Sequence, residues 1–413
     1  MSNFENYKRL SKLLAFNYKG VELSHVTACQ IWAAANGEKV FSMRGLFNFF
    51  LKYNVSSLKL PAENGFLSTF MESWRKDHHD LYLSVVDRLT VHPEVNELIN
   101  MRKKPSIRMV NIYKVLTSIL KHLKSSELSL WEKFYWAANY TLLCNTIDSL
   151  NKMDFSKVHK YLCMCHVLGL ENLFTQYFRN KGITTYSLQE GIYLVYKKNI
   201  VLGSIAYELF ATDHLLCWGQ YTKDEYSAYG IEPSRVNVAG YPKCNEIKSL
   251  KKNNSFRKCL VMLAGPIFGD VNMKLIQMLN AKRNEFNFTL KSHPVNYDEM
   301  EDYARTNNFN IVPKSKTVSD CLVSEEFDFC IAVNTTTYYE SWMAGVPCVR
   351  YHDDRFDNFY GFDDLFSNEE QFKTMINGYR VCPKTEDEVK EMLKYSIGFG
   401  LDNYDKVINE DLQ

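Results

Sequence analysis

Charge of one sign is not in excess in this chain of 413 residues, because 49 Lys and Arg are balanced by 48 Asp and Glu. The balance gives no general argument for nucleic acid or for a bulk acidic partner, so charge can act only locally. Long hydrophobic runs are also missing, since no uninterrupted apolar stretch reaches the ~18 residues of a membrane span. The N-terminus, Met-Ser-Asn-Phe-Glu-Asn, lacks the basic start and apolar run of a signal peptide. We therefore expect a cytoplasmic protein, with any membrane contact peripheral and at the inner face of the cytoplasmic membrane.

Disulfide and metal spacings are missing as well. The eleven cysteines are scattered, which predicts reduced, buried thiols in a cytosolic protein. Cys163-Met-Cys165-His166 resembles a metal fragment, but no second cluster follows it, so we expect core thiols on a strand. An Asp-x-Asp motif of the kind that binds a metal and a diphosphate is absent. The sequence predicts no metal site.

What the chain does have is enough length for two domains, since 413 residues exceed what one hydrophobic core usually spans. The first ~155 residues are mostly helical in pattern, with large apolar residues spaced by three or four. The clearest cases are residues 47–53, 67–74 and 128–138, and residues 39–43 are a short strand candidate. A strand–helix–strand unit follows, then two more strands around a helix: 158–165, 171–180, 183–188, 214–218, 222–229 and 236–239.

A polar stretch at residues 248–257 predicts a domain linker. Beyond it, strands are expected at 258–264, 287–292, 309–312, 328–333 and 347–351, and helices at 271–283, 297–306, 317–325 and 336–344. Strands that alternate with helices indicate an α/β fold with a parallel, doubly wound sheet. The predicted domains are 1–250 and 251–384, and residues 385–413 form a polar helical tail that could cross back onto the first domain.

A cluster of three threonines follows the predicted strand 328–333. Thr335, Thr336 and Thr337 open a helix whose first N–H groups and positive dipole end would hold a phosphate. Ordinary N-capping is the alternative, because Ser, Thr and Asn are preferred caps. Asn334 precedes the cluster, and Glu340 lies one turn further, where it is either a ribose-binding carboxylate or a solvated helix acid.

His293-Pro294 follows another predicted strand. Proline disfavours helical geometry in the residue before it, so the imidazole is expected in an extended turn at the sheet edge. It could contact a phosphate there, although a lone histidine is usually structural. Ligands bind outside the carboxyl ends of such strands, which places Gly265, His293 and the threonines along one edge.

Gln189-Glu190-Gly191 follows the strand 183–188 in the first domain. Across a cleft from the second domain, the Glu190 carboxylate could take a proton from an acceptor hydroxyl. A turn acid before a glycine with unusual dihedral angles is the alternative.

Two further features are local. Residues 102–124 carry seven Lys and Arg and no acid, together with an apolar stripe. Such a helix either rests on an anionic membrane or glycan, or is a core helix with a solvated basic face, which we favour. Asp77-His78-His79-Asp80 looks like a ligand cluster, but consecutive helical positions diverge around the axis, so we expect a solvated surface patch.

The order of motifs, with an acid beside glycine, then His-Pro, then a hydroxyl cluster, resembles a family. It is similar to bacterial glycosyltransferases of GT-B fold that use CMP-activated sugars, namely sialyltransferases, polysialyltransferases and Kdo transferases, and to CDP-glycerol polymerases. The resemblance covers roughly residues 158–351 and implies two Rossmann-like domains facing across a cleft. It also implies that Glu190 is the general base, while His293-Pro294 and Thr335–Thr337 bind the CMP part. Gln189 departs from the family, which often has a second acid there.

The resemblance implies a metal-independent, inverting glycosyltransferase that needs no cofactor beyond its nucleotide sugar. The expected donor is a CMP-sugar such as sialic acid or Kdo, and the expected acceptor is an oligosaccharide or lipid-linked glycan of bacterial capsule or lipopolysaccharide. Residues 339–347 also look like the nucleotide-binding helix of UDP-sugar GT-B enzymes. A UDP-sugar transferase, a UDP-sugar 2-epimerase and a non-catalytic glycan-binding subunit are therefore the alternatives.

Overall fold

The structure is a computed structural model. It describes residues 3–70, 76–124, 128–167, 169–192, 194, 197–198, 200–243, 246–251, 256–324, 327–381 and 383–410.

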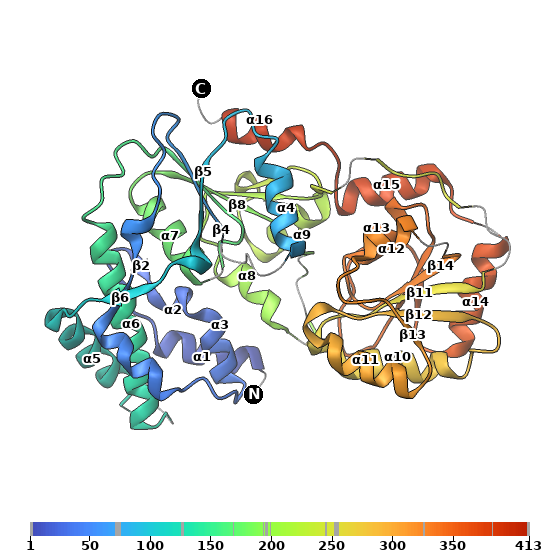
Figure 1. The fold of residues 1–413 in the computed structure, drawn as a ribbon, viewed down its shortest axis with the longest axis horizontal. Coiled ribbons are helices and arrows are strands. Elements are labelled where there is room, and N and C mark those ends of the chain that lie inside the picture. Colours follow the sequence, from blue (N-terminus) through green and yellow to red (C-terminus); the bar gives the residue numbers. More distant parts are fainter. Residues whose placement is uncertain are drawn as a thin grey trace.

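Two six-stranded parallel sheets, one in each half of the chain, form the framework (Figure 1). The first has the order β10-β9-β8-β7-β4-β5 and the second the order β13-β12-β11-β14-β15-β16. The first consists of β4 (Phe66–Phe70), β5 (Glu94–Glu97), β7 (Lys160–Cys163), β8 (Thr184–Leu188), β9 (His214–Cys217) and β10 (Val236–Val238). The second consists of β11 (Lys258–Met262), β12 (Asn287–Lys291), β13 (Asn310–Ile311), β14 (Phe329–Ala332), β15 (Cys348–Tyr351) and β16 (Leu365–Phe366). This confirms the predicted fold class of two doubly wound, Rossmann-like domains.

Helices surround both sheets. In the first half these are α1 (Asn3–Leu13), α2 (Leu23–Val26), α3 (Ala28–Ala35), α4 (Lys76–Val86), α5 (Met109–His122), α6 (Leu130–Leu150), α7 (Gly169–Asn180), α8 (Ile205–Glu208) and α9 (Gln220–Tyr229). In the second half they are α10 (Gly269–Asn280), α11 (Tyr297–Thr306), α12 (Val318–Ser324), α13 (Thr337–Met343) and α14 (Glu369–Val381). The last two helices are α15 (Glu386–Ser396) and α16 (Asp402–Glu410). Short 3₁₀ turns include η1 (Met43–Phe50), η6 (Pro266–Phe268) and η7 (Pro294–Asn296).

The α/β alternation from residue 158 to residue 351 was predicted correctly apart from the short helix α8, whereas β16 and α14 were not predicted and the first 155 residues contain errors. The helix expected at 67–74 is wrong, because Phe66–Phe70 is β4, a fully buried strand between β7 and β5; residues 71–74 lie outside the described ranges. The spacing of the apolar residues in this segment suggested a helix, but the polar Ser68 and Thr69 between them are buried too, and a short run buried on both faces cannot be assigned by periodicity alone. The strand candidate at 39–43 is also wrong, since these described residues form irregular chain up to the start of η1. Residues 47–53 are the end of η1 followed by the strand β3 (Leu51–Tyr53), which pairs with β6 (Lys103–Pro105).

The segment after α15 crosses from the second half to the first (Figure 1). A Cβ on Gly219 would lie 2.5 Å from the backbone of Ser396, and one on Gly398 would lie 2.3 Å from the carbonyl of Trp218. Only glycine allows this approach of main chain to main chain. Beyond the crossing, the Tyr404 hydroxyl of α16 donates a hydrogen bond of 2.7 Å to the Gly240 carbonyl. The end of the chain is thus packed on the first half. Within the described ranges, no helix is both long enough and apolar enough to cross a membrane.

Candidate functional site

Three neighbouring strands of the second sheet end beside one another, and each is followed by predicted site residues. Met262 of β11 is in register with Lys291 of β12 and with Ala332 of β14. Parallel strands end at the same edge of a sheet. This register therefore places Gly265, His293 and Asn334, which come just after the three strands, at one edge. A Cβ on Gly265 would lie 3.8 Å from the His293 ring, an ordinary contact distance, so the two residues lie side by side at this edge.

His293 sits in an extended conformation, as the following proline predicts. Its φ and ψ are −64° and 139°, and its Nδ1 accepts a hydrogen bond of 3.3 Å from the Val295 N–H. That bond fixes the ring, since the accepting nitrogen must be unprotonated and the other nitrogen is left as the donor in the neutral ring. Pro294 and Val295 are exposed beside it, so apolar surface flanks the imidazole.

The threonine cluster lies on the other side of Gly265. Asn334 has a positive φ of 36°, and this sharp turn leads from β14 into α13. The Thr337 hydroxyl lies 3.3 Å from the Thr335 hydroxyl, so two hydroxyls point to the same place. Thr336 is the N-cap residue, but its side chain makes no capping hydrogen bond. The Thr335 hydroxyl does accept a hydrogen bond of 3.5 Å from the Thr337 N–H, so the alternative of ordinary capping describes Thr335 but not Thr336.

In the first half, Glu190 follows β8 and lies beside a histidine. Its Oε2 is 3.9 Å from Nδ1 of His78, and the glutamate side chain is 25% exposed. His78 belongs to α4, the helix that follows β4, and β7 separates β4 from β8 in the sheet. The pair therefore bridges two strand ends over the carboxyl end of β7.

Gln189 holds the turn that presents Glu190. Its side-chain carbonyl accepts a hydrogen bond of 2.7 Å from the Trp218 N–H, and its amide donates one of 2.7 Å to the Gly191 carbonyl. Both partners are uncharged groups of the backbone, and the Gln189 side chain is buried. A carboxylate could accept from Trp218 but could not donate to Gly191, which is a local reason for glutamine at this position.

The expectation that residues 77–80 form a solvated surface patch is wrong for His78, which is only 7% exposed. The helical spacing was correct, but the strand before it was missed. With β4 recognised, this cluster would have been placed at a strand end like the other motifs. His78 is therefore the residue that sequence reasoning should have added to the site.

The two halves meet at these strand ends. The Tyr241 hydroxyl, just after β10, donates a hydrogen bond of 2.9 Å to Oε1 of Glu340 in α13. The Asp357 carboxylate, after β15, accepts hydrogen bonds of 2.6 and 2.9 Å from the backbone N–H groups of Lys197 and Lys198. The carboxyl edges of both sheets therefore face a common junction.

One alternative for Glu340 was a helix acid in contact with solvent only. It does not hold, because the Tyr241 and Ser319 hydroxyls contact its two oxygens at 2.9 and 3.3 Å. A carboxylate has about four acceptor sites, so two remain for a ligand. The roles of Glu190, His293, the threonines and Glu340 in binding or catalysis, and a direct facing of Glu190 and His293, stay predictions.

Two other features of the described residues bear on the site. A cavity of about 530 Å³ lies at the chain crossing and contains none of the predicted site residues; it is lined by Arg88 and by residues 246–250, 386–387, 389–390 and 399–402. In the part of the chain that the structure describes, no three His, Cys, Asp or Glu side chains are grouped as metal ligands would be.

Comparisons with known proteins give a likeness at the level of structure. No protein-family model and no curated protein matches the sequence. The structure is similar to the S. aureus MnaA–UDP co-structure, with a TM-score of 0.51 and 10% identity over 84% of this chain and 96% of that one. It also aligns with the apo form of the lipopolysaccharide outer core galactosyltransferase WaaB, with a TM-score of 0.49 and 12% identity over 84% of this chain and 99% of that one. Together with the two parallel sheets, the likeness shows a two-domain GT-B fold.

Proposed function

We propose that this protein is a glycosyltransferase that moves a sugar from a nucleotide-activated donor to a glycan or lipid-linked glycan of the bacterial surface. The observation that supports the proposal is the common junction, at which the Tyr241–Glu340 hydrogen bond joins the carboxyl edge of the first sheet to the carboxyl edge of the second. Glu190 follows a strand of the first edge, and His293 and the threonines follow strands of the second. Ligands of doubly wound folds bind at such edges.

In the proposed reaction, Glu190 accepts the proton of an acceptor hydroxyl as its oxygen attacks the anomeric carbon of the donor. The bond between that carbon and the donor phosphate oxygen breaks, and the nucleotide leaves with the electron pair. His293 and Thr335–Thr337 donate hydrogen bonds to the phosphate charge that develops, and Glu340 accepts from the ribose. A single displacement inverts the anomeric centre, and the scheme uses no metal.

His78 positions the base in this scheme. At 3.9 Å, its ring is near enough to orient the Glu190 carboxylate or to relay the proton onward. His78→Asn should lower kcat and alter the pH profile of kcat without changing nucleotide affinity. A merely structural role would lower thermal stability and leave the pH profile of the remaining activity unchanged.

The favoured donor is a CMP-sugar, from the motif order. A UDP-sugar reaction, either transfer or 2-epimerisation, is the second candidate, and it is favoured by the likeness to a UDP-bound structure. A thermal-shift screen with CMP, CDP, UMP, UDP and GDP separates the two, because a ligand that binds only the folded state raises its stability. Stabilisation by UDP alone would exclude the CMP version, and no stabilisation by any nucleotide would refute the proposal.

Catalysis is tested by release of the nucleotide from CMP- and UDP-sugars with and without EDTA. Glu190→Gln should lower turnover by about 10²–10⁴-fold, the usual contribution of a general base, while nucleotide affinity stays the same. Glu299→Gln, on the exposed face of α11, is the matched control. Nucleotide binding without turnover in the unmodified protein would instead identify a non-catalytic subunit, and loss of activity in EDTA would refute metal independence.

A further inference from the structure

Two segments of the first half contain cations and no acid. Residues 39–62 hold four Lys and Arg, and residues 98–124 hold seven, whereas the whole chain has a net charge of only +1. The structure pairs these segments through the antiparallel strands β3 and β6. A strong positive charge is therefore concentrated on one part of the fold.

Large apolar side chains are exposed on the same two segments. In a 3₁₀-helix, side chains three positions apart lie in one row, and Arg44, Phe47 and Phe50 of η1 form such a row with all three exposed. Phe47 is 65% exposed. On α5, Val110 and Tyr113 are 64% and 72% exposed, although the opposite side of that helix is buried against α6.

The β3–β6 pair joins the two rows. The Ser106 N–H donates a hydrogen bond of 2.8 Å to the Phe50 carbonyl, which puts the end of η1 beside Ile107 and the start of α5. Ile107 is itself 67% exposed. We call the surface formed by Arg44, Phe47, Phe50, Ile107, Val110 and Tyr113 the basic–apolar face, with the exposed cations Arg102, Lys104 and Lys114 around it.

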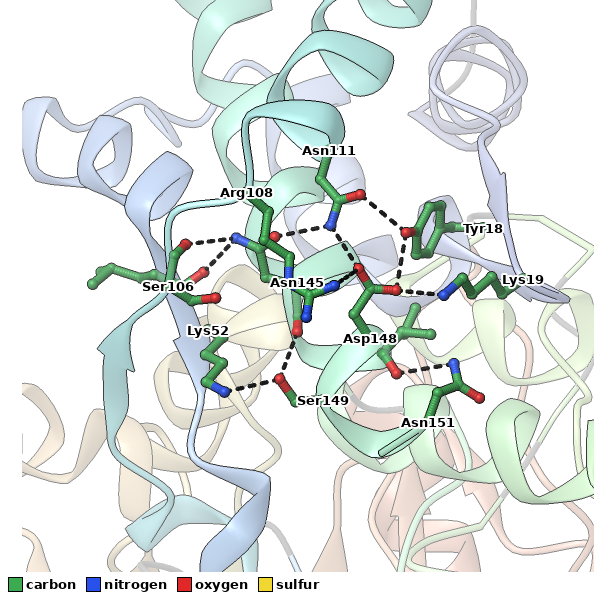
Figure 2. Close-up of polar contacts among 12 residues, drawn as sticks. Tyr18, Lys19, Lys52, Ser106, Arg108, Asn111, Asn145, Asp148, Ser149 and Asn151 are labelled. Carbon is green, nitrogen blue, oxygen red and sulfur yellow. Dashed lines mark hydrogen bonds and ion pairs between the residues drawn. The ribbon is translucent and has the colours of Figure 1, made fainter. Parts of the chain in front are cut away.

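A buried polar network holds this face in place (Figure 2). The Asp148 carboxylate of α6 accepts hydrogen bonds of 2.6 Å from Arg108 and 3.0 Å from Asn111, both at the start of α5. Tyr18 and Lys19 complete its shell at 3.0 and 2.6 Å. Burial opposes ionisation, but these donors outweigh it and hold the pKa of Asp148 below its ordinary value. The first turn of α5 is thus fixed by a charged anchor, with its apolar side chains pointing away from it.

We propose that the basic–apolar face docks on an anionic lipid bilayer. Aromatic and aliphatic side chains enter the boundary between headgroups and acyl chains, while surrounding Lys and Arg bind anionic headgroups. A second copy of the chain fits poorly, because a two-fold interface would place the same cations opposite one another. Nucleic acid could bind the cations, but it offers no apolar environment for the exposed side chains of Ile107 and Val110. This proposal is independent of the glycosyl transfer proposed above.

Flotation of the full chain with phosphatidylcholine vesicles, with and without 30% phosphatidylglycerol, tests the docking. We expect binding only to the anionic vesicles, weakened by salt. Two variants should each lower the affinity at least tenfold. The first, Lys104→Glu with Lys114→Glu, reverses the charge of two cations, and one cation near such a surface contributes about fivefold. The second, Phe47→Ser with Val110→Ser and Tyr113→Ser, removes the apolar side chains that enter the bilayer. The matched controls are Lys314→Glu with Lys394→Glu, and Val323→Ser, all at exposed positions of the second half and its following helix.

Melting temperatures of the variants, compared with the unmodified chain, show whether they are folded. Equal binding to neutral and anionic vesicles, or no binding to either, would overturn the proposal. So would a loss of binding in the controls as large as in the face variants. A dimer seen by sedimentation that the serine variants dissociate would assign the face to a second copy, and retention on RNA in place of vesicles would assign it to nucleic acid.

Discussion

Acidification should destabilise the first half through one buried histidine. His166 follows β7, which lies in the sheet between β8, the strand before Glu190, and β4, the strand before the helix of His78. The His166 side chain is 0% exposed. Its Nδ1 lies 3.0 Å from the Ser187 hydroxyl. Burial, helped by the positive charge of Arg235, lowers the pKa of His166 to about 3. The ring is therefore neutral in the folded protein down to low pH.

The direction of the pH effect on stability depends on whether the folded or the unfolded state binds the proton more readily. The unfolded chain protonates this histidine below its ordinary pKa of ~6.5, whereas the folded chain does so only near 3. Between these values the unfolded state holds more protons, so stability falls as the pH falls. Each pH unit is worth ~1.4 kcal/mol, so the loss at pH 5 is about 2 kcal/mol relative to pH 7 and above.

The assay compares urea unfolding of the unmodified chain with His166→Gln from pH 8 to pH 5. The substitution has a cost that does not depend on pH, and other titrating groups, such as the half-buried His25, act equally in both proteins. The difference between the two free energies of unfolding should therefore shrink by about 2 kcal/mol over this range. A difference that stays constant with pH would show that His166 takes up its proton over the same pH range in the folded and unfolded states, and would refute the reasoning.

Three substitutions test the packing around the site. Arg350→Met leaves the Asp364 carboxylate, 2.6 Å from Arg350 and fully buried, without its counter-charge, and should cost about 3–5 kcal/mol in urea unfolding; Arg305→Met, which removes an exposed ion pair with Asp302, should change little. Gly398→Ala should cost at least about 1 kcal/mol, because φ is +65° and a Cβ would meet the Trp218 carbonyl at 2.3 Å; an unchanged melting temperature would contradict this. Tyr241→Phe removes one hydrogen bond from Glu340 and should cost about 1 kcal/mol, and an equal loss in a Glu340→Gln background would show that the two residues are not coupled.

The fold was predictable where the sequence alternates between buried strands and amphipathic helices. Strands β7 to β10 and β11 to β15 were placed within a few residues, because each is a short, largely apolar run next to a helix or a polar turn. Strand β4 was lost because Leu67 and Phe70 are spaced as on one face of a helix, while Ser68 and Thr69 between them are also buried, with their hydroxyls hydrogen-bonded to the Leu162 carbonyl and the Tyr161 hydroxyl. The strand β5 and the helix α14 were also not predicted, and β5, Glu94–Glu97, has a sequence of acids and one valine that is typical of neither strands nor cores.

The candidate site was predictable only where a residue follows a recognised strand. Gly265, His293 and Asn334 lie at one edge because register places them there. His78 and Tyr241 depend on which strands are neighbours and on how the two halves meet, and neither follows from local pattern. The Tyr241–Glu340 bond joins residues 99 positions apart, so no local signal could have shown that Glu340 already has a partner.

The contacts between the halves also determine how the junction can open. At the chain crossing, main chain packs on main chain around Gly219, Gly240 and Gly398. A Cβ added to any of the three would lie 2.3 to 2.9 Å from the facing backbone, so the two main chains have no room to slide. At the strand ends, the contacts between the halves include the Tyr241–Glu340 hydrogen bond, two N–H groups on Asp357 and the rings of Tyr221 and Tyr360, 6.1 Å apart; the hydrogen bonds are each worth about 0.5–1.5 kcal/mol. Polar side-chain contacts of this kind break more readily than a main-chain packing that only glycine allows. We therefore expect an opening of the junction to pivot at the crossing and to separate the two sheet edges.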